Sequence, residues 1–315
     1  MFRTIEIKLN DSIDGKLIEI FGCLTDIQYS DSDTSVMNTS TRRYRNSLNQ
    51  ISKAIRVWRS YEQENHLKMK FVLQLGDLID NKSKNTTEGS LYSMYKVLNH
   101  LKEMKSQVLN VYGNHEFYNF NRSEIVNLPL NTAKMLNPNW KSNANYYAYH
   151  ISVNLKLICL DFYEYSELGY DDDLGNDMLL RAKAYIQHMK TIHSNYISFN
   201  GGLNEQQLVW LTTQLKSCRE TNTKAIIAGH LPINKLAANE KFLAWNNDQI
   251  LELIWQFDDV CVMYLSGHYH LGGYNLDEHN IHHLTLPGIV ELSPESSSFI
   301  SCLVYENKVV VNFGF

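Results

Sequence analysis

Side chains that can bind metal ions recur at five places along the chain, each directly after a short apolar run. They are Asp26 with Gln28, Asp77, Asn114 with His115, His230, and His268 with His270. Oxygen and imidazole donors without any thiolate favour Mn, Mg, Fe or Zn in a site of five or six ligands over a structural zinc site. Two such ions about 3.5–4 Å apart can share a bridging carboxylate and activate a water molecule. Asp77, the carboxylate of a Gly-Asp pair, is the natural bridge, so these residues predict a two-metal hydrolase.

Each of these elements also has a plain structural explanation when it is taken alone. Two histidines separated by one residue are commonly surface side chains, and a single histidine such as His230 is more often hydrogen-bonded in a core. Gln28 would be an ordinary loop residue, and Asn114 would be a turn residue after Gly113. Five such elements in order, each behind an apolar run, favour a shared site over five coincidences.

The apolar runs that precede these residues predict strands. Those strands cover residues 17–23, 71–75, 108–112, 225–228 and 260–265. Between them, apolar side chains at spacings of three and four predict amphipathic helices over residues 44–58, 91–104 and 204–215. Further strands are expected at residues 146–149, 155–160, 282–286, 299–305 and 309–313. Strands that alternate with helices and then give way to short β segments predict an α/β (mixed α+β) fold, with mixed sheets covered by helices.

This order of elements explains how residues far apart in the sequence can meet. Loops that leave the carboxyl ends of neighbouring strands converge on one side of an α/β sheet, where ligand sites lie. A glycine accompanies the polar residues at four of the five places and lets the backbone turn tightly there. The five elements are therefore expected in one site.

Bulk composition limits the classes of protein that fit. The 315 residues suit a single domain, 1–315, with loop insertions near 81–90 and 163–202; the second insertion holds the acidic run Asp171 to Asp173, which we expect to be solvated. A net charge of −5 argues against nucleic acid or a membrane as partner, but not against an anionic substrate beside metal ions. There is no long apolar run and no signal peptide pattern. We expect a cytoplasmic monomer with reduced core cysteines.

The ordered set resembles the calcineurin-like metallophosphoesterases, whose pattern runs D-x-H, G-D, G-N-H-[DE], G-H and G-H-x-H. One departure is informative, because Gln28 stands where most of that superfamily has histidine. In this respect the chain is similar to the manganese-dependent ADP-ribose/CDP-alcohol diphosphatase family, and other segments match that family as well. They are residues 43–48, 74–77, 113–120, 199–202, 243–246 and 267–274. The resemblance implies a four-layer αββα sandwich in which two mixed sheets are flanked by helices.

The resemblance also implies roles for single residues. Seven would bind two divalent metal ions: Asp26, Gln28 and His270 one ion, Asn114, His230 and His268 the other, and Asp77 both. His115 would be the catalytic residue that stabilises phosphoryl charge or protonates the leaving group, oriented by Glu116 or a neighbouring acid. Four residues would bind the substrate: Arg43, Asn200, Gly201 and Trp245. Manganese is the preferred ion because an amide oxygen is a harder donor than imidazole, with Mg, Fe or Zn as alternatives.

The activity that the resemblance implies is hydrolysis of the phosphoanhydride of ADP-ribose or of CDP-alcohols such as CDP-choline. The products would be a nucleoside monophosphate and a phosphorylated sugar or alcohol. The alternative is a cyclic-nucleotide or broad-specificity phosphodiesterase on the same two-metal site. Protein serine/threonine phosphatases would need an arginine after Asp80, where Asn81 and Lys82 stand, and a non-catalytic scaffold would have lost ligands or His115. A small nucleotide is thus the expected partner.

Overall fold

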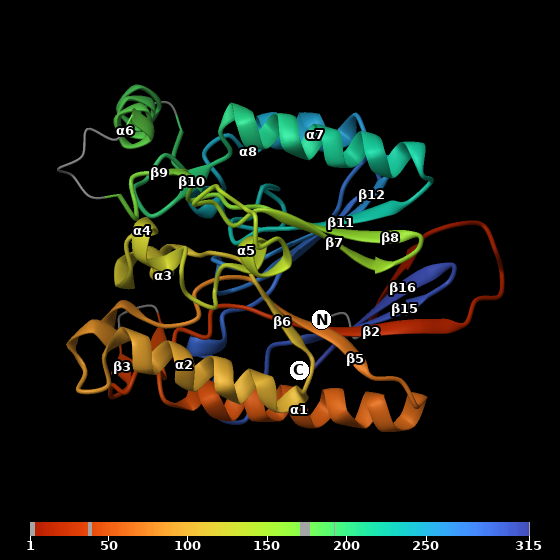
Figure 1. Ribbon diagram of the computed structural model, residues 1–315, viewed down its shortest axis with the longest axis horizontal. Coiled ribbons are helices and arrows are strands. Elements are labelled where there is room, and N and C mark those ends of the chain that lie inside the picture. The colour runs from red at the N-terminus through yellow and green to blue at the C-terminus, as the bar shows by residue number, and fades with distance from the viewer. Residues whose placement is uncertain (1–3, 37–39, 171–176, 192, 315) are drawn as a thin grey trace.

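The computed structural model describes residues 4–36, 40–170, 177–191 and 193–314. Figure 1 shows four layers, with two sheets stacked face to face and helices on both outer sides. Within the described residues each of these sheets has six strands and mixes parallel with antiparallel pairs. The predicted α/β fold and its four-layer αββα arrangement are therefore confirmed.

The first sheet joins the start of the chain to its end. Its strands, in order, are β1 (Thr4–Lys8), β16 (Lys308–Phe313), β15 (Ile300–Tyr305), β2 (Leu17–Leu24), β5 (Met69–Gln74) and β6 (Gln107–Asn110). Strands β2, β5 and β6 run parallel, and the other three add antiparallel pairs. The sequence analysis did not predict β1, because its apolar residues alternate with charged ones and only Ile5 and Ile7 are buried.

The second sheet is built from the middle of the chain. Its strands, in order, are β13 (Gly273–Leu276), β14 (His282–Thr285), β12 (Cys261–Ser266), β11 (Lys224–Ala228), β8 (Leu155–Cys159) and β7 (Tyr147–Ser152). The four central strands are parallel, and antiparallel β7 and β13 form the edges. The expected pairing of residues 146–149 with 155–160 is confirmed as β7 with β8. Strand β13 was not predicted, since it is a short edge strand that is only partly buried.

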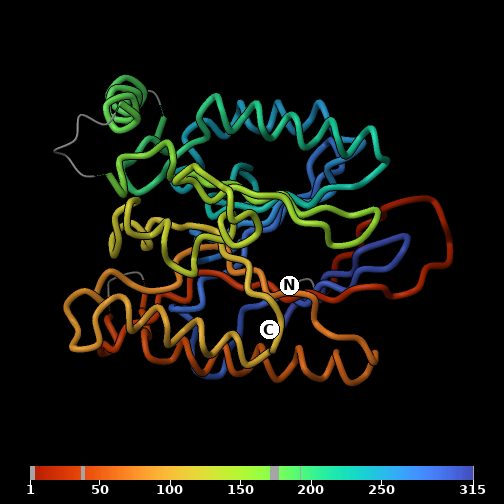
Figure 2. The backbone as a smooth tube through the Cα atoms, viewed as in Figure 1, coloured from red at the N-terminus to blue at the C-terminus, as the bar shows by residue number. Residues whose placement is uncertain are grey.

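Long helices cover the outer face of each sheet (Figures 1 and 2). They are α1 (Asn46–Asn65) and α2 (Gly89–Leu101) on the first sheet, and α7 (Glu205–Glu220) and α8 (Asn247–Trp255) on the second. The predicted apolar stripe of α1 is buried at Ile51, Ile55 and Trp58. Helix α7 begins as expected at Asn204, whose side chain accepts the backbone N–H of Gln207. Helix α8 was not predicted, because its apolar stripe spans only nine residues.

The core lies between the two sheets. Phe21 of β2 and Phe71 of β5 stack with ring centroids 4.8 Å apart, and Tyr149 of β7 meets Phe71 edge to face at 5.3 Å. These rings join the first sheet to the second, and buried aromatic rings remove a large apolar area from water. Each of the five cysteines is free and buried, as expected for core thiols.

Shorter elements connect the layers. They are β3 (Ser35–Val36), β4 (Thr41–Arg42), β9 (Tyr165–Ser166), β10 (Gly201–Gly202), α3 (Asn114–Asn119), α4 (Arg122–Ile125), α5 (Thr132–Leu136), α6 (Asp177–Met189), and the 3₁₀ turns η1 (Asn81–Asn85), η2 (Lys102–Met104), η4 (Glu240–Phe242) and η5 (Ile289–Glu291). The segment 81–90 holds η1 and the start of α2, and the segment 163–202 holds β9, α6 and β10. The acidic run Asp171 to Asp173 lies outside the described residues. Of the helices described, none is long and apolar enough to cross a membrane.

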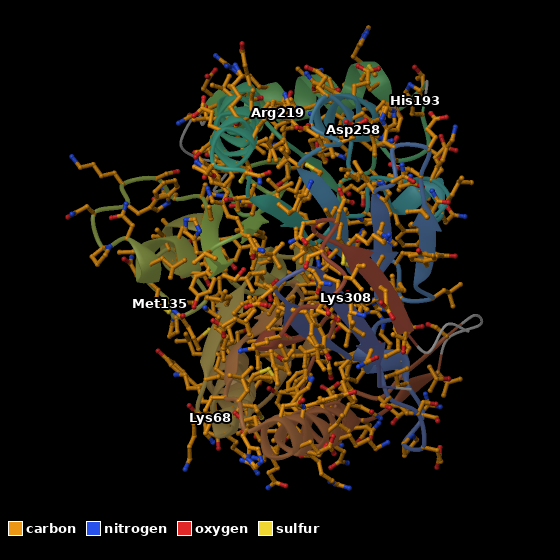
Figure 3. The ribbon with its side chains drawn as sticks, turned by 90° about the vertical axis from the view of Figure 1, so that its right-hand side faces the viewer. Lys68, Met135, His193, Arg219, Asp258 and Lys308 are labelled. Atoms are coloured by element: carbon orange, nitrogen blue, oxygen red, sulfur yellow. The ribbon has the colours of Figure 1, made fainter. Side chains whose placement is uncertain are left out.

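Charged side chains gather on the outside of the layers. Figure 3 labels Arg219 and Asp258 on one helical layer, Lys68 at the opposite end of the molecule, and Lys308 on β16. Lys308 of β16 pairs with Glu6 of the neighbouring edge strand β1 at 2.8 Å. Exposed pairs of this kind contribute little to stability, so the fold rests on the apolar contacts between the layers.

Candidate metal centre

A cavity of about 430 Å³ lies at the carboxyl ends of the central strands. The loops after β2, β5, β6 and β12 contribute to its wall the predicted residues Gln28, Asp77, Asn114, His115, His268 and His270. Asp26 and His230 are fully buried and contact these residues. The structure thus brings all seven predicted ligands and His115 together, as the converging loops of the sheets require.

The backbone at four of the predicted ligands adopts a conformation that most residues avoid. Asp26, Gln28, Asp77 and His268 have positive φ angles of 49°, 40°, 60° and 65°. A non-glycine residue in this left-handed region is strained by about 1–3 kcal/mol, and such strain persists only where the surroundings enforce it. Its concentration at these loops indicates a functional site, where strain of this kind commonly gathers.

Asp77 lies at the centre of the cluster. Its Oδ1 accepts the backbone N–H of His115 at 2.8 Å, which fixes the carboxylate. Its Oδ2 accepts from Nε2 of Gln28 at 3.0 Å and lies 3.4 Å from Nε2 of His230. One oxygen therefore faces a member of each predicted ligand set, which is the arrangement that a bridging carboxylate needs.

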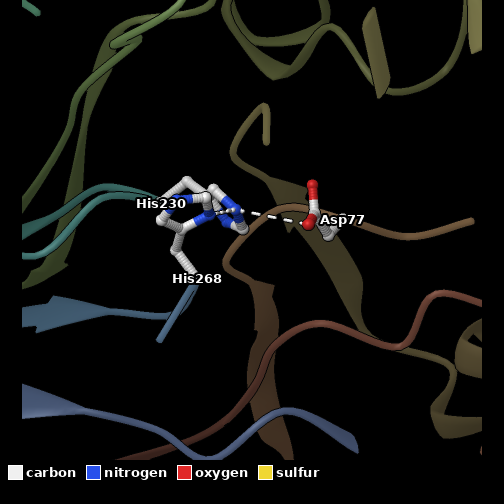
Figure 4. A group of neighbouring side chains, drawn as sticks. All are labelled: Asp77, His230 and His268. Carbon is white, nitrogen blue, oxygen red and sulfur yellow. Dashed lines mark hydrogen bonds and ion pairs between the residues drawn. The ribbon is translucent and has the colours of Figure 1, made fainter. Parts of the chain in front are cut away.

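His230 and His268 face each other beside Asp77 (Figure 4). Nδ1 of His230 donates to the carbonyl oxygen of Leu75 at 2.7 Å. Nε2 of His268 donates to Oδ1 of Asn200 at 2.9 Å. The remaining ring nitrogens, Nε2 of His230 and Nδ1 of His268, are 3.2 Å apart beside the Asp77 carboxylate, so a proton or a metal ion can be held between them. The ligand atoms of Asp77, His230 and His268 lie within 4.8 Å of one another, so the set fits a divalent metal ion once His230 has released its proton.

Asp26, Gln28 and His270 form the second predicted set. Oδ2 of Asp26 accepts from the Thr25 hydroxyl at 2.7 Å, and its Oδ1 lies 3.2 Å from Nε2 of His270. Nε2 of Gln28 lies within 3.0–3.5 Å of three acceptor atoms, on Asp26, Asp77 and His270. Its buried Oε1 has no partner in the described part of the chain. Since the two ends of an amide are nearly the same size, turning Gln28 over adds Oε1 to a ring of acceptors that suits a cation.

His115 begins α3 with Asn114 and reaches the centre from that helix. Its Nε2 lies 3.9 Å from Oδ2 of Asp77. Its Nδ1 accepts the backbone N–H of Asn81 at 3.3 Å and lies 3.4 Å from the carboxylate of Asp80. The hydroxyl of Tyr163 donates to Oδ1 of Asn114 at 3.4 Å.

Glu116 has a role that differs from the first option given for it, which was to orient His115. Its carboxylate accepts the backbone N–H groups of Asp77, Leu78 and Gly113 at 2.6–2.8 Å. It therefore ties the loop after β5 to the loop after β6. Of the two options left open by the sequence, the acid that faces His115 is the neighbouring one, Asp80.

Burial and charge oppose each other in this cluster. Burial would raise the pKa of Asp77, but His230 and His115 more than offset it and hold that pKa below its ordinary range. Burial would lower the pKa of His230, but the Asp77 carboxylate raises it to about 9. Burial and the charge of His230 lower the pKa of His268 to about 3. The metal-free protein thus keeps a proton on His230, between Asp77 and His268, and a metal ion would displace it.

Two glycines allow the loops to approach this closely. Gly76 has a φ angle of 100°, and a Cβ atom there would collide with the ring of His230. A Cβ atom at Gly267 would collide with Thr25 and Asp26. Both glycines are required because only a residue without a side chain fits against the ligands.

The four residues that were expected to bind the substrate make structural contacts around the site. Asn200 is fully buried and holds His268. Arg43 donates to backbone carbonyl groups, Gly201 pairs with β9, and Trp245 is buried in a small apolar cluster. All four are described residues, and none of them lines the cavity. Their segments anchor loops around the site, and direct contact of these four residues with the substrate stays a prediction.

The sequence analysis did not single out several residues of the cavity wall. Arg42, next to the predicted Arg43, faces the cavity beside Glu291. Four aromatic residues also line it: Tyr118, Phe199, Phe242 and Tyr269. Phe199 belongs to the segment 199–202 and Phe242 directly precedes the segment 243–246, and both segments were expected to line the substrate pocket. No pattern in the sequence distinguished Arg42 from Arg43.

The calcineurin-like phosphoesterase family model matches residues 21–272. The chain belongs to this family. Relatives of this phosphoesterase named manganese-dependent ADP-ribose/CDP-alcohol diphosphatase occur in Xenopus laevis (33% identity; 92% of this chain and 86% of the relative), Homo sapiens (33%; 92% and 88%) and Arabidopsis thaliana (31%; 92% and 92%). The match to these diphosphatases over most of the chain confirms the predicted family.

A solved structure supports the same grouping of this phosphoesterase. The crystal structure of a dimetal phosphatase from Danio rerio superposes with a TM-score of 0.85 at 27% sequence identity. The superposition covers 95% of this chain and 96% of the Danio rerio chain. The fold of the two proteins is therefore shared almost from end to end.

Proposed function

We propose that the protein is a manganese-dependent diphosphatase, which hydrolyses the phosphoanhydride of ADP-ribose and of CDP-alcohols to a nucleoside monophosphate and a phosphorylated sugar or alcohol. The observation that carries this proposal is the meeting of His230, His268 and Asp77, whose ligand atoms lie within 4.8 Å of one another and fit a divalent cation. The names of the relatives supply the substrate class. They do not favour the alternative, a cyclic-nucleotide or broad-specificity phosphodiesterase.

Two divalent ions, with manganese preferred, are assigned to the two sets of side chains. The sets are Asp26, Gln28 and His270 for one ion and Asn114, His230 and His268 for the other, with Asp77 shared. When bound, the ions offset negative charge on the phosphoryl oxygens and lower the pKa of a water molecule. The protein side chains fix where these charges lie before the substrate arrives.

His115 is the proposed catalytic side chain. Its Nδ1 accepts the N–H of Asn81, so the proton of the neutral ring resides on Nε2. Burial lowers the pKa of His115, which keeps the ring neutral at physiological pH. From Nε2 the proton can pass to a phosphoryl oxygen or to the leaving group.

The aromatic part of the wall suits a nucleobase. The ring centroids of Phe199 and Phe242 are 6.0 Å apart, and each lies close to the ring of His268. Stacking of a base on an aromatic side chain contributes about 1–3 kcal/mol. We expect Phe242→Ala to raise the KM for ADP-ribose about tenfold with a smaller change in kcat, measured by AMP release.

The decisive experiment is a substrate panel. Metal-stripped protein would be incubated with ADP-ribose, CDP-choline, a 2′,3′-cyclic nucleotide and an aryl phosphodiester, each with Mn²⁺ or Mg²⁺. We expect release of AMP and CMP that depends on Mn²⁺. Turnover of the cyclic or aryl diesters alone would favour the phosphodiesterase alternative, and no turnover despite bound metal would reject the hydrolase.

The remaining expectations concern partners and location. A small nucleotide is the partner that the proposed activity requires. A monomeric state and a cytoplasmic location stay predictions from the sequence, and size-exclusion chromatography with light scattering would test the first.

A further inference from the structure

A chain of charged side chains connects His270 to His115. Nδ1 of His270 lies 2.8 Å from Oε1 of Glu291, and Nε of Arg42 lies 3.8 Å from that oxygen. The other end of the Arg42 guanidinium donates to Oδ2 of Asp80 at 3.3 Å. The same oxygen of Asp80 lies 3.4 Å from Nδ1 of His115. One arginine therefore lies between two carboxylates, each of which faces a histidine of the site.

The contact with Glu291 decides which nitrogen of His270 faces the centre. A carboxylate has no proton to give, so Nδ1 of His270 is the donor and Nε2 is left to face the cluster. Nε2 lies 3.2 Å from Asp26 and 3.1 Å from Gln28. A carboxylate on the far nitrogen of a metal-binding histidine fixes the orientation of the ring and strengthens it as a ligand.

The main chain of Glu291 is held in place independently of its side chain. The N–H of Val290 donates to the carbonyl oxygen of Asp26 at 3.0 Å. Arg43 donates from its guanidinium to the carbonyl oxygen of Glu291 at 2.9 Å. Because these contacts keep η5 against the site, a substitution of the Glu291 side chain tests positioning rather than folding.

We propose that Glu291 is a positioning residue for His270, and that Arg42, which is itself bound to Asp80, holds Glu291 in place. The bridge connects the metal ligand His270 to Asp80, whose carboxylate lies 3.4 Å from Nδ1 of His115. This inference rests on the proposed function, in which His270 is a metal ligand. It assigns a role to two residues, Arg42 and Glu291, that lie outside the metal motifs.

Mn²⁺ binding to metal-stripped, full-length protein tests the role of Glu291. In Glu291→Ala we expect one Mn²⁺ ion to bind about 10–100-fold more weakly, the usual effect of losing such a partner. Glu291→Gln retains an oxygen acceptor for Nδ1 and should recover most of the affinity. Equal losses in the two variants would overturn the positioning role. The matched control is Glu88→Gln, since Glu88 is 18% exposed, as against 21% for Glu291, and pairs with Lys96 outside the cavity.

His270→Ala separates failure of this inference from failure of the proposed function. If His270→Ala binds both Mn²⁺ ions as tightly as the wild type, the ligand assignment fails. If His270→Ala weakens binding and Glu291→Ala does not, the ligand assignment holds and the positioning role is overturned. Urea unfolding of each metal-free variant would be measured alongside, so that a loss of stability is distinguished from a loss of Mn²⁺ binding.

A double-variant cycle tests the role of Arg42. Arg42→Ala should weaken the same Mn²⁺ ion by a smaller factor than Glu291→Ala. The double variant should bind Mn²⁺ no more weakly than Glu291→Ala alone, because both changes break one bridge. Multiplied losses in the double variant would overturn the link between the two residues. The electron paramagnetic resonance spectrum of bound Mn²⁺ should change alike in Arg42→Ala and Glu291→Ala, and a wild-type spectrum in either would count against the bridge.

Discussion

His268 and His270 are separated by one residue, yet the protein surrounds them in opposite ways. His268 donates from Nε2 to the neutral amide of Asn200 and presents Nδ1 to the centre. His270 donates from Nδ1 to the carboxylate of Glu291 and presents Nε2. The same residue type thus offers two different ligand atoms, because the partner on the far side of each ring decides which nitrogen is free.

Charge separates the two histidines further. Burial and the charge of His230 lower the pKa of His268 to about 3. For His270 burial acts in the same direction, but Asp26 and Glu291 more than offset it and raise the pKa to about 9. His268 is therefore neutral and ready to bind a metal ion at physiological pH, whereas His270 must release a proton before it can bind an ion. A motif of two nearby histidines can therefore contain one rigid neutral ligand and one that is coupled to surrounding charges.

Removing the carboxylate of Asp77, which is proposed to bind both metal ions, should have the largest effect. In Asp77→Asn we expect turnover to fall by about 10³-fold or more and binding of both Mn²⁺ ions to weaken, because the bridging charge is lost. Asp277→Asn is the matched control, since Asp277 is a buried carboxylate paired with His283 at 2.8 Å away from the cavity. Kinetics and calorimetric titration with Mn²⁺ would be compared, and similar losses in both variants would point to a general effect of removing a buried charge.

A substitution at a residue that is not a proposed ligand should separate the chemical step from metal binding. His115→Ala should lower kcat about 10²–10⁴-fold, the usual contribution of a general acid or base. Mn²⁺ affinity should stay at the wild-type value, because His115 is not assigned as a ligand. Weakened Mn²⁺ binding in this variant would instead place His115 among the ligands.

The two histidines with raised pKa values should make metal binding depend on pH. The pKa values of His230 and His270 are raised to about 9 in the metal-free protein, so each ring carries a proton at pH 7. A protonated ring cannot bind an ion, so Mn²⁺ affinity should rise as pH rises, by about tenfold per pH unit below 9 for each ion. Calorimetry in buffers of different ionisation enthalpy would count the released protons. Affinity that is flat between pH 6 and 8 would contradict this assignment.

Changing the partner of His268 should give the smallest effect and sharpen the comparison. Asn200→Asp keeps an acceptor for His268 but loses the two donors that bind the carbonyl groups of Asn195 and Lys241 at 2.8 and 2.9 Å. We expect the free energy of unfolding to fall by about 1–3 kcal/mol, measured in urea. The new carboxylate should also raise the pKa of His268, followed by NMR. An unchanged pKa would argue that the partner does not set the difference between the two histidines.

The sequence predicted most of the strands and long helices, because they carry apolar runs or periodic apolar patterns, and the family resemblance supplied their arrangement in four layers. It missed elements whose pattern is weak or whose partner is distant. Strand β1 pairs with β16, about 300 residues further along the chain, and its charged residues concealed its two buried positions. The helix α8 was missed because nine residues are too few for its apolar stripe to be distinguished from a loop.

The residues of the candidate site likewise fall into those that local motifs predicted and those that they did not. The donor residues and their glycines were predicted from local motifs, since each motif is a few residues long and follows its own strand. The residues around them were not, because their positions depend on contacts between distant segments. Arg42 rather than Arg43 faces the cavity, and Asp80 rather than Glu116 faces His115.

By itself, the sequence determined which atoms are available to two metal ions and which family of folds would bring them together. The tertiary structure alone decided which nitrogen of each histidine faces the centre, and which side chains form the cavity wall. The physical reason is that a ring nitrogen is selected by the hydrogen bond on its far side. For His268 and His270 the partners, Asn200 and Glu291, come from segments on opposite sides of the motif in the sequence, and only folding places them there.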